Sequence, residues 1–281
     1  MSHLLEDRYG KSCIRLMKVI RDDRGHRLMD WTLNILFRGD FESCFVRGDN
    51  SKILPTDTMK NTVYSLARVS TATCMEEFGL ELTNYFLNGN PQVTEVSVEI
   101  DERAWRHAMI DQLEHPTTFL QDNQEVQSSC IVQQRGMAAE VNSGLKHLVI
   151  LKTANSKFEG FIKDRLTTLR EADDRLFGTE ITCKWRYEVS EKAAFETDRR
   201  EIRRVIISAF AEHNSLSVQH TLYAVADAIL SRNSTVREIT IAMPNRHCLL
   251  VDLAPFGQDN PNVIFVPTDE PHGYIEATLR R

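Results

Sequence analysis

The amino-acid sequence changes character over one stretch, Gly48-Asp49-Asn50-Ser51-Lys52-Ile53-Leu54-Pro55-Thr56-Asp57-Thr58-Met59-Lys60-Asn61-Thr62-Val63-Tyr64. Before this stretch apolar residues alternate at every second position, and from Thr58 onward they recur with a helical period. Thr56 and Asp57 stand where the helix starts, so we predict that they are N-cap residues. Such a helix start suits a small anionic or carbonyl-rich ligand, although a solvated, well-capped loop is the simpler interpretation.

The composition is that of a soluble globular protein. The chain has 281 residues, of which 42% are hydrophobic and 26% charged, enough for one large domain or two ordinary ones. Its formal net charge of −6 gives no concentrated basic surface, so we do not expect nucleic acid as a partner. No window approaches the ~20 apolar residues that cross a bilayer, so we do not expect a membrane partner.

The chain ends and the cysteines indicate a cytoplasmic location. The first residues, Met1–Asp7, lack the apolar core of a signal peptide, and the last residues form no peroxisomal tripeptide. The six cysteines, at positions 13, 44, 74, 130, 183 and 248, are scattered along the chain. We therefore expect reduced, mostly buried thiols and no disulfide framework.

The first half of the chain is predicted to have the order ββααββ. Alternating residues predict strands over Ser12–Ile20 and Leu28–Phe37, joined by the polar turn Asp22–Gly25. Helical spacing follows, first from Thr58 and then over Thr71–Leu87. Two further strands are predicted over Val93–Trp105 and Glu125–Gln134.

The second half repeats this order. The predicted elements are strands Lys146–Thr153 and Glu180–Tyr187, helices Glu201–Glu212 and Val218–Ser231, and strands Glu238–Met243 and His247–Leu253. Two copies of one topology suggest an internal duplication, with one unit over residues 1–137 and the other over 138–281. The expected fold class is α+β, in which helices cover one face of an antiparallel sheet and the other face is free to meet another subunit.

Residues suited to acid–base chemistry occur outside the opening stretch. Lys11 directly precedes a strand; partial desolvation would lower its pKa enough for a base, although most such lysines are surface charges. Asn245 and His247 lie at a strand–turn–strand corner, and imidazole is the natural proton relay near neutral pH. The alternative for His247 is a structural role.

A second group of residues suits the binding of a flat polar molecule. Phe158 lies in a polar, glycine-containing loop, where it either packs or stacks on a ligand. Arg175 offers a planar fork for paired acceptors, or forms an ion pair with Asp173 or Asp174. Gln219, at a helix start, can donate to and accept from the amide edge of a heterocycle, or is solvated.

Taken together, these segments resemble the urate oxidase (uricase) family over nearly the whole chain. The longest matching runs are GDNS at 48–51 with TDT at 56–58 and KNTVY at 60–64, and NSKF at 155–158 with GF at 160–161, TTL at 167–169 and DR at 174–175. The resemblance implies the T-fold, a tandem of two ββααββ units that assembles into a homotetramer around a tunnel. It also implies that Thr56 and Asp57 reach the active site of a neighbouring subunit.

The resemblance implies a catalytic relay of Lys11, Thr56 and His247, which takes a proton from urate and later steers water. Asn245, together with Thr56, would hold dioxygen above the purine plane. The implied reaction converts urate, dioxygen and water to 5-hydroxyisourate and hydrogen peroxide, with no cofactor or metal and with dioxygen as co-substrate.

The resemblance also implies how urate is held. Arg175 and Gln219 would grip the flat edge of the substrate, and Phe158 would stack on its ring. The backbone at Val218 and Asp57 would supply the remaining contacts.

Two alternatives stand beside this expectation. Another enzyme of the same fold, such as one that handles pterins, would use zinc-ligand histidines or a glutamate anchor, whereas Arg175 and Gln219 favour an oxidised purine with carbonyl edges. A non-catalytic scaffold would have no need for lysine, threonine, histidine and asparagine at the relay positions.

Overall fold

The structure is a computed structural model that describes residues 3–22, 25–188, 193–268 and 270–281. The chain divides into two compact units: unit 1 comprises Met1–Gly144 with Arg186–Glu196, and unit 2 comprises Leu145–Trp185 with Thr197–Arg281. Asp23 and Arg24, the centre of the first predicted turn, lie outside the described residues.

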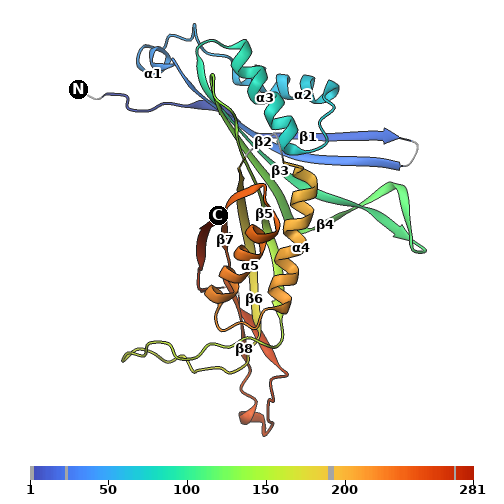
Figure 1. The fold of residues 1–281 in the computed structure, drawn as a ribbon, viewed down its shortest axis with the longest axis vertical. Helices are drawn as coiled ribbons and strands as arrows, with labels where there is room; N and C mark the ends of the chain where they lie inside the picture. Colours follow the sequence, from blue (N-terminus) through green and yellow to red (C-terminus); the bar gives the residue numbers. More distant parts are fainter. Residues whose placement is uncertain (1–2, 23–24, 189–192, 269) are drawn as a thin grey trace. The chain divides into compact units, whose positions relative to one another are not determined.

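Unit 1 has two helices packed on one face of a four-stranded sheet (Figure 1). Its elements are β1 (Tyr9–Asp22), β2 (Gly25–Gly39), α1 (Glu42–Arg47), α2 (Thr56–Val69), α3 (Met75–Gly89), β3 (Val93–Ile110) and β4 (Leu113–Gln134). The strands pair in chain order, and every pair is antiparallel. The core lies between the sheet and the helices, around fully buried Trp31, Phe78 and Phe86.

Unit 2 repeats this plan with an insertion before its last strand. Its elements are β5 (Glu140–Lys152), β6 (Phe177–Tyr187), α4 (Phe195–Glu212), α5 (Val218–Arg232), β7 (Val236–Ala242), β8 (Asn245–Leu250), β9 (Phe265–Thr268) and β10 (Glu276–Arg280), with a short 3₁₀ helix over Ala254–Phe256. The start of β5 up to Gly144, the end of β6 from Arg186 and the start of α4 up to Glu196 are counted with unit 1. The sheet order is β5-β6-β7-β10, and β8 pairs with β6 and β9.

The predicted elements are present, but some are longer than predicted: β4 starts at Leu113 and not at Glu125, and α4 starts at Phe195 and not at Glu201. Two further predictions are corrected. The prediction that His247–Leu253 closes the second sheet is wrong: β8 covers that region and pairs with β6 and β9, while β10 pairs with β7. The second helix starts at Met75 and not at Thr71, because Cys74 has extended backbone angles at the N-cap. The expected α+β class with two ββααββ units is confirmed.

The two units correspond residue by residue in their second helices. The buried face of α3 matches that of α5, so that Met75 aligns with Val218, Leu82 with Val225 and Phe86 with Ile229.

The C-termini of both of these helices are capped by an arginine side chain. The Arg135 guanidinium donates to the carbonyl oxygens of Leu87, Asn90 and Val93, and Arg281 donates to those of Leu230, Asn233 and Ser234. The carbonyl groups of a helix C-terminus have no partner within the helix, so each arginine supplies one.

The second strands of the two units correspond as well. Buried positions in β2 are Met29, Asp30, Trp31, Leu33, Ile35 and Phe37, and in the same order in β6 they are Phe177, Gly178, Thr179, Ile181, Cys183 and Trp185. This alignment places Arg27 at the position of Arg175. An independent contact agrees with the alignment of the second helices, which pairs Ser70 with His213, because Lys18 of β1 donates to the Ser70 carbonyl oxygen at 2.8 Å and Lys152 of β5 donates to the His213 carbonyl oxygen at 2.6 Å.

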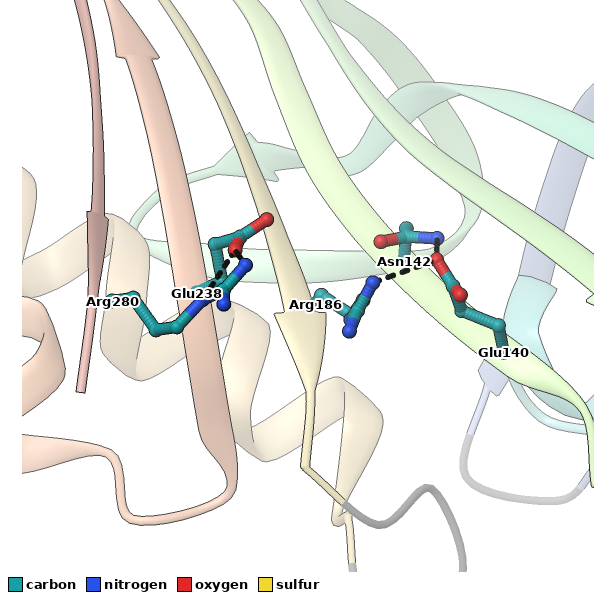
Figure 2. Close-up of polar contacts among 5 residues, drawn as sticks. All are labelled: Glu140, Asn142, Arg186, Glu238 and Arg280. Atoms are coloured by element: carbon teal, nitrogen blue, oxygen red, sulfur yellow. Dashed lines mark hydrogen bonds and ion pairs between the residues drawn. The ribbon is translucent and has the colours of Figure 1, made fainter.

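Cross-strand ion pairs lie on the exposed parts of the strands. Figure 2 shows Arg280 of β10 on Glu238 of β7, and Arg186 of β6 on Glu140 of β5, whose carboxylate also accepts from Asn142. Exposed pairs of this kind contribute about 0–1 kcal/mol each, so the buried apolar faces dominate the stability.

None of the six cysteines, all among the described residues, forms a disulfide. The expectation that most are buried is wrong: only Cys183 is buried, Cys13 is exposed, and the other four are intermediate. Burial raises the pKa of the Cys74 thiol to about 12. Among the described helices, none combines the length and the apolar character needed to cross a membrane.

Candidate active site

A β-bulge sets the place of Lys11 in unit 1. The register between β1 and β2 shifts between Lys11 and Ile14, and Cys13 there has a φ of 57° and donates its N–H to Asn34 Oδ1 at 2.8 Å. A Cβ on Gly10 would lie 1.8 Å from the Ile35 carbonyl oxygen. Only glycine therefore allows the strand to pass this close, directly beside the half-buried Lys11.

The start of α2 is held close to β1. The Leu54 N–H donates to the Tyr9 hydroxyl at 2.9 Å, and the Tyr9 ring packs edge-on against Phe37 and Phe41. Two residues beyond Leu54, the half-buried Thr56 opens the helix.

The prediction that Thr56 and Asp57 are N-cap residues is wrong. Pro55 is the N-cap, with φ −55° and ψ 137°, and it places Thr56 and Asp57 inside the first turn. No side chain makes a capping hydrogen bond at the N-terminus of α2. The Asp57 carboxylate instead accepts from Lys60 and Asn61, and the Lys60 hydrogen bond, with a smaller contribution from the charge of Lys11, lowers the pKa of Asp57. Lys11, Thr56 and Asp57 thus form one polar group in unit 1.

In unit 2 a clip of backbone hydrogen bonds holds the loop that carries Phe158. The Lys157 N–H donates to the Ser215 carbonyl oxygen at 2.7 Å, and the Ser215 N–H donates to that of Asn155 at 3.0 Å. Phe158 itself exchanges two backbone hydrogen bonds with Ala172, at 2.9 and 3.1 Å. The loop therefore lies against both the segment before α5 and the segment before Arg175.

Arg175 is the most informative residue of unit 2. Its guanidinium lies over the Phe158 ring, 5.2 Å from the centroid, and its buried Nε has no hydrogen-bond partner among the described residues. The alternative ion pair with Asp173 or Asp174 is not formed: Asp174 Oδ1 accepts from the backbone N–H groups of Ser156 and Arg175, at 3.0 and 3.1 Å. Burial lowers the pKa of the Arg175 guanidinium, which forms no ion pair with a described residue.

The Phe158 ring has a packing partner as well. It stacks on Phe161 with ring centroids 5.0 Å apart and an interplanar angle of 13°. The packing interpretation of Phe158 is therefore confirmed, and its stacking on a ligand stays a prediction.

Helix α5 begins beside this loop. Ser217 is its N-cap and accepts the His220 N–H at 3.1 Å. Val218 is buried and Gln219 is exposed. The first turn thus presents free backbone amides and the Gln219 amide next to the Phe158 loop.

Asn245 and His247 lie on β8, which is anchored to β6. Asn245 pairs with Thr179 in the strand register, and its Nδ2 lies 3.3 Å from His247 Nδ1. The amide donates in this arrangement, so the imidazole Nδ1 accepts and its proton stays on Nε2. Burial, then the positive charge of Arg175 and then His272, lower the pKa of His247 and keep the ring neutral near pH 7.

Some positioning residues had not been singled out from the sequence. Ser156 and Ser215 are buried and form a parallel β-bridge, and the Thr221 hydroxyl donates to Ser215 Oγ at 2.8 Å while it lies 3.1 Å from His213 Nδ1. The position of Ser215, two residues before the N-cap Ser217, could have drawn attention to it. Its β-bridge partner Ser156 could not be identified from that segment alone.

The described residues offer no obvious metal centre. No group of three or more histidine, cysteine, aspartate or glutamate side chains in the described ranges could hold a metal ion. The polar atoms that remain unpaired near Arg175, Ser156 Oγ and Thr179 Oγ1, are hydroxyls suited to hydrogen bonding with an organic ligand or water.

The fold and the two polar groups define a class of protein: a tandem ββααββ chain in which a guanidinium lies over a phenyl ring. A sequence model described as "Uricase" matches residues 7–132 and 141–276. The chain therefore belongs to the uricase family.

Individual relatives agree over the whole length. Uricase of Arthrobacter globiformis is 38% identical, covering 98% of this chain and 89% of the relative, and uricase of Dictyostelium discoideum is 34% identical, covering 100% and 98%. The crystal structure of the Arthrobacter uricase matches with a TM-score of 0.94 at 36% identity and covers 100% of this chain and 96% of that one. The structure of Bacillus sp. TB-90 urate oxidase, 22% identical with a TM-score of 0.87, supports the fold.

Proposed function

We propose that this chain is a urate oxidase, which converts urate, dioxygen and water to 5-hydroxyisourate and hydrogen peroxide. The main support for the proposal comes from Arg175. Its partly buried guanidinium lies over the Phe158 ring, and its Nε has no hydrogen-bond partner among the described residues. A buried cation without an ion pair is costly, so the protein retains it for an anionic ligand. Urate is such a ligand, being flat, anionic and lined with carbonyl oxygens.

The residues of unit 2 bind and orient urate in this proposal. The Arg175 fork takes two acceptors on one edge of the purine, and the Gln219 amide and the Val218 backbone N–H take the adjacent edge. The Phe158 ring lies against the purine plane, supported from behind by Phe161.

The relay residues move the protons. Urate gives up two electrons to dioxygen and gains a hydroxyl from water, while dioxygen takes up two protons and leaves as hydrogen peroxide. His247, neutral because its pKa is lowered, accepts a proton, and Lys11 with Thr56 returns protons to the reduced oxygen. Asn245 and Thr56 hold dioxygen, and later water, above the ring. The chemistry needs an electron-rich anion held in a water-poor site and uses no cofactor.

The site is completed by two chains. Unit 1 carries one half-site, made of Lys11, Thr56 and the backbone of Asp57. Unit 2 carries the other, the urate half-site, made of Phe158, Arg175, Val218, Gln219, Asn245 and His247. We propose that the unit 1 half-site joins the urate half-site of a neighbouring subunit in a tunnel-shaped homotetramer. The uncovered sheet faces and exposed apolar residues such as Ile110 and Leu113 support an assembly. We place the boundary between the duplicated modules at residues 137 and 138 and the protein in the cytoplasm.

One assay tests the proposed function. Metal-free protein is given urate in air, and the loss of urate absorbance is followed together with the release of peroxide. We expect one peroxide for each urate consumed, with no requirement for added metal or flavin. Absence of urate loss, or turnover only after zinc is added, would contradict the proposal.

A further inference from the structure

The cavity of greatest interest outside the candidate active site lies wholly within unit 1. It has a volume of about 780 Å³ and lies between the outer part of β1, the end of α2 and the segment that leads into α3. Its walls are Leu16–Arg21, Arg27, Tyr64, Ala67, Arg68 and Ser70–Thr73.

The polar lining of this cavity is cationic. Lys18, Arg21, Arg27 and Arg68 line it, and none of the described lining residues is an aspartate or a glutamate. Lys18 is committed to the Ser70 carbonyl oxygen at 2.8 Å. The three arginines make no ion pair with a described residue. Four positive charges around a partly apolar cavity attract an anion with an apolar body.

The cavity occupies the same place in unit 1 as the urate half-site does in unit 2. The burial patterns of β2 and β6 align Arg27 with Arg175, and the faces of α3 and α5 align Ser70–Thr73 with the segment that starts at His213. The matching lysine contacts, Lys18 to Ser70 and Lys152 to His213, agree with the alignment of the segments before α3 and α5. The duplicated fold therefore places an arginine, Arg27, in the lining of this cavity at the position of Arg175.

Two differences separate this cavity from a catalytic site. Glu76 stands where α5 has Gln219, but it is fully buried, bonded to Ser143, and does not line the cavity. In unit 2 the chain turns after β7 and presents Asn245 and His247, whereas β3 continues without a break to Ile110. The cavity therefore has the positively charged side chains but no counterpart of Asn245 and His247.

We propose that unit 1 contains a second, non-catalytic site that binds a flat organic anion of the chemical class of urate. Arg27 and Arg68 hold the charge, and the Tyr64 ring and the apolar wall of Leu16 and Ala67 contact the flat body. The choice of ligand class depends on the proposed function, because the cavity is the counterpart of the urate half-site.

Equilibrium dialysis of radiolabelled urate under argon tests the proposal, since turnover stops without dioxygen. We expect two urates per chain for the wild type, one for Arg175→Gln and one for the double variant Arg27→Gln/Arg68→Gln. Arg47→Gln, which changes an exposed arginine of α1 away from the cavity, should retain two. In air, the double variant should oxidise saturating urate at the wild-type rate.

Other outcomes separate the two proposals. One urate per chain, lost in Arg175→Gln and unaffected by Arg27→Gln/Arg68→Gln, would overturn the second site and leave the proposed function standing. No urate binding and no turnover by the wild type would overturn the function as well. Inorganic phosphate is dialysed in parallel, and phosphate binding lost in the double variant without a second urate would contradict the preference for a flat organic anion.

Discussion

Unit 1 and unit 2 share a scaffold and differ in the connections that carry chemistry. Their helices end on equivalent arginines, Arg135 and Arg281, and their second strands have the same buried pattern. Unit 1 joins its first two strands directly, while unit 2 inserts the long connection between β5 and β6 that carries Phe158 and Arg175. A duplicated fold can thus keep its core and place new functions in its loops.

Substitution of Lys11 by alanine should have the largest effect, because it removes the only cationic proton donor among the unit 1 site residues Lys11, Thr56 and Asp57. We expect kcat for urate to fall by about 10³ with little change in KM, a typical size for loss of a general acid or base. Stopped-flow measurement of urate absorbance gives both constants. Lys184→Ala, at an exposed position in β6, is the control. Near-normal turnover of Lys11→Ala would remove Lys11 from the relay.

Substitution of Arg175 by glutamine should act on binding, because it removes the cation of the unit 2 half-site and keeps a polar side chain. Loss of a buried charged contact costs about 2–5 kcal/mol, so KM for urate should rise by roughly 10² or more. Arg170→Gln, an exposed neighbour in the same connection, should leave KM unchanged. An unaltered KM in Arg175→Gln would contradict the clamp.

Truncation of the two helix-capping arginines tests the similarity of the units. Arg135→Met and Arg281→Met each leave several carbonyl oxygens without a donor, so we expect losses of about 1–3 kcal/mol in the free energy of unfolding, of similar size in both. Thermal and denaturant unfolding measure them, with exposed Arg8→Met as the control. A loss of stability in only one of the two variants would show that the two arginines do not contribute equally to the free energy of unfolding.

The titration of His247 should respond to Arg175. Because burial and then the charge of Arg175 lower the pKa of the imidazole, the neutral, proton-accepting form persists below the ordinary value of 6.5. Removal of the charge in Arg175→Gln should move the His247 pKa upward, toward that value. Nuclear magnetic resonance of the imidazole protons measures the change, and a downward shift would contradict the assigned cause.

Much of the fold was predictable because period-two and helical spacings reflect burial on one face. Both ββααββ units follow from such local patterns. Strand β10 was missed because Glu276–Arg280 is short and acquires its identity from pairing with β7, far away in the sequence. The N-cap prediction failed because Pro55 has the extended backbone of a cap and moves Thr56 one position into the helix.

From the residues themselves the candidate site was predictable only as a set of residue types, and the resemblance to the urate oxidase family joined them into one expected site. The sequence indicated Phe158, Arg175 and His247 one by one, with alternatives for each. It could not show that Asp174 is engaged by two backbone amides, and this contact decides that Arg175 has no ion pair there. Such non-local hydrogen bonds arise from tertiary packing and leave no periodic signal.

Subunit complementation tests whether unit 1 of one chain and unit 2 of its neighbour complete the site, as we propose. Lys11→Ala and Arg175→Gln chains are co-assembled, and urate loss with peroxide release is compared with each variant alone. A site shared between chains combines an intact unit 1 with an intact unit 2 in some pairs, so activity should return to about a quarter of the wild-type value in a random mixture. If both halves came from one chain, every site would keep one lesion, and the absence of any recovery would contradict the account.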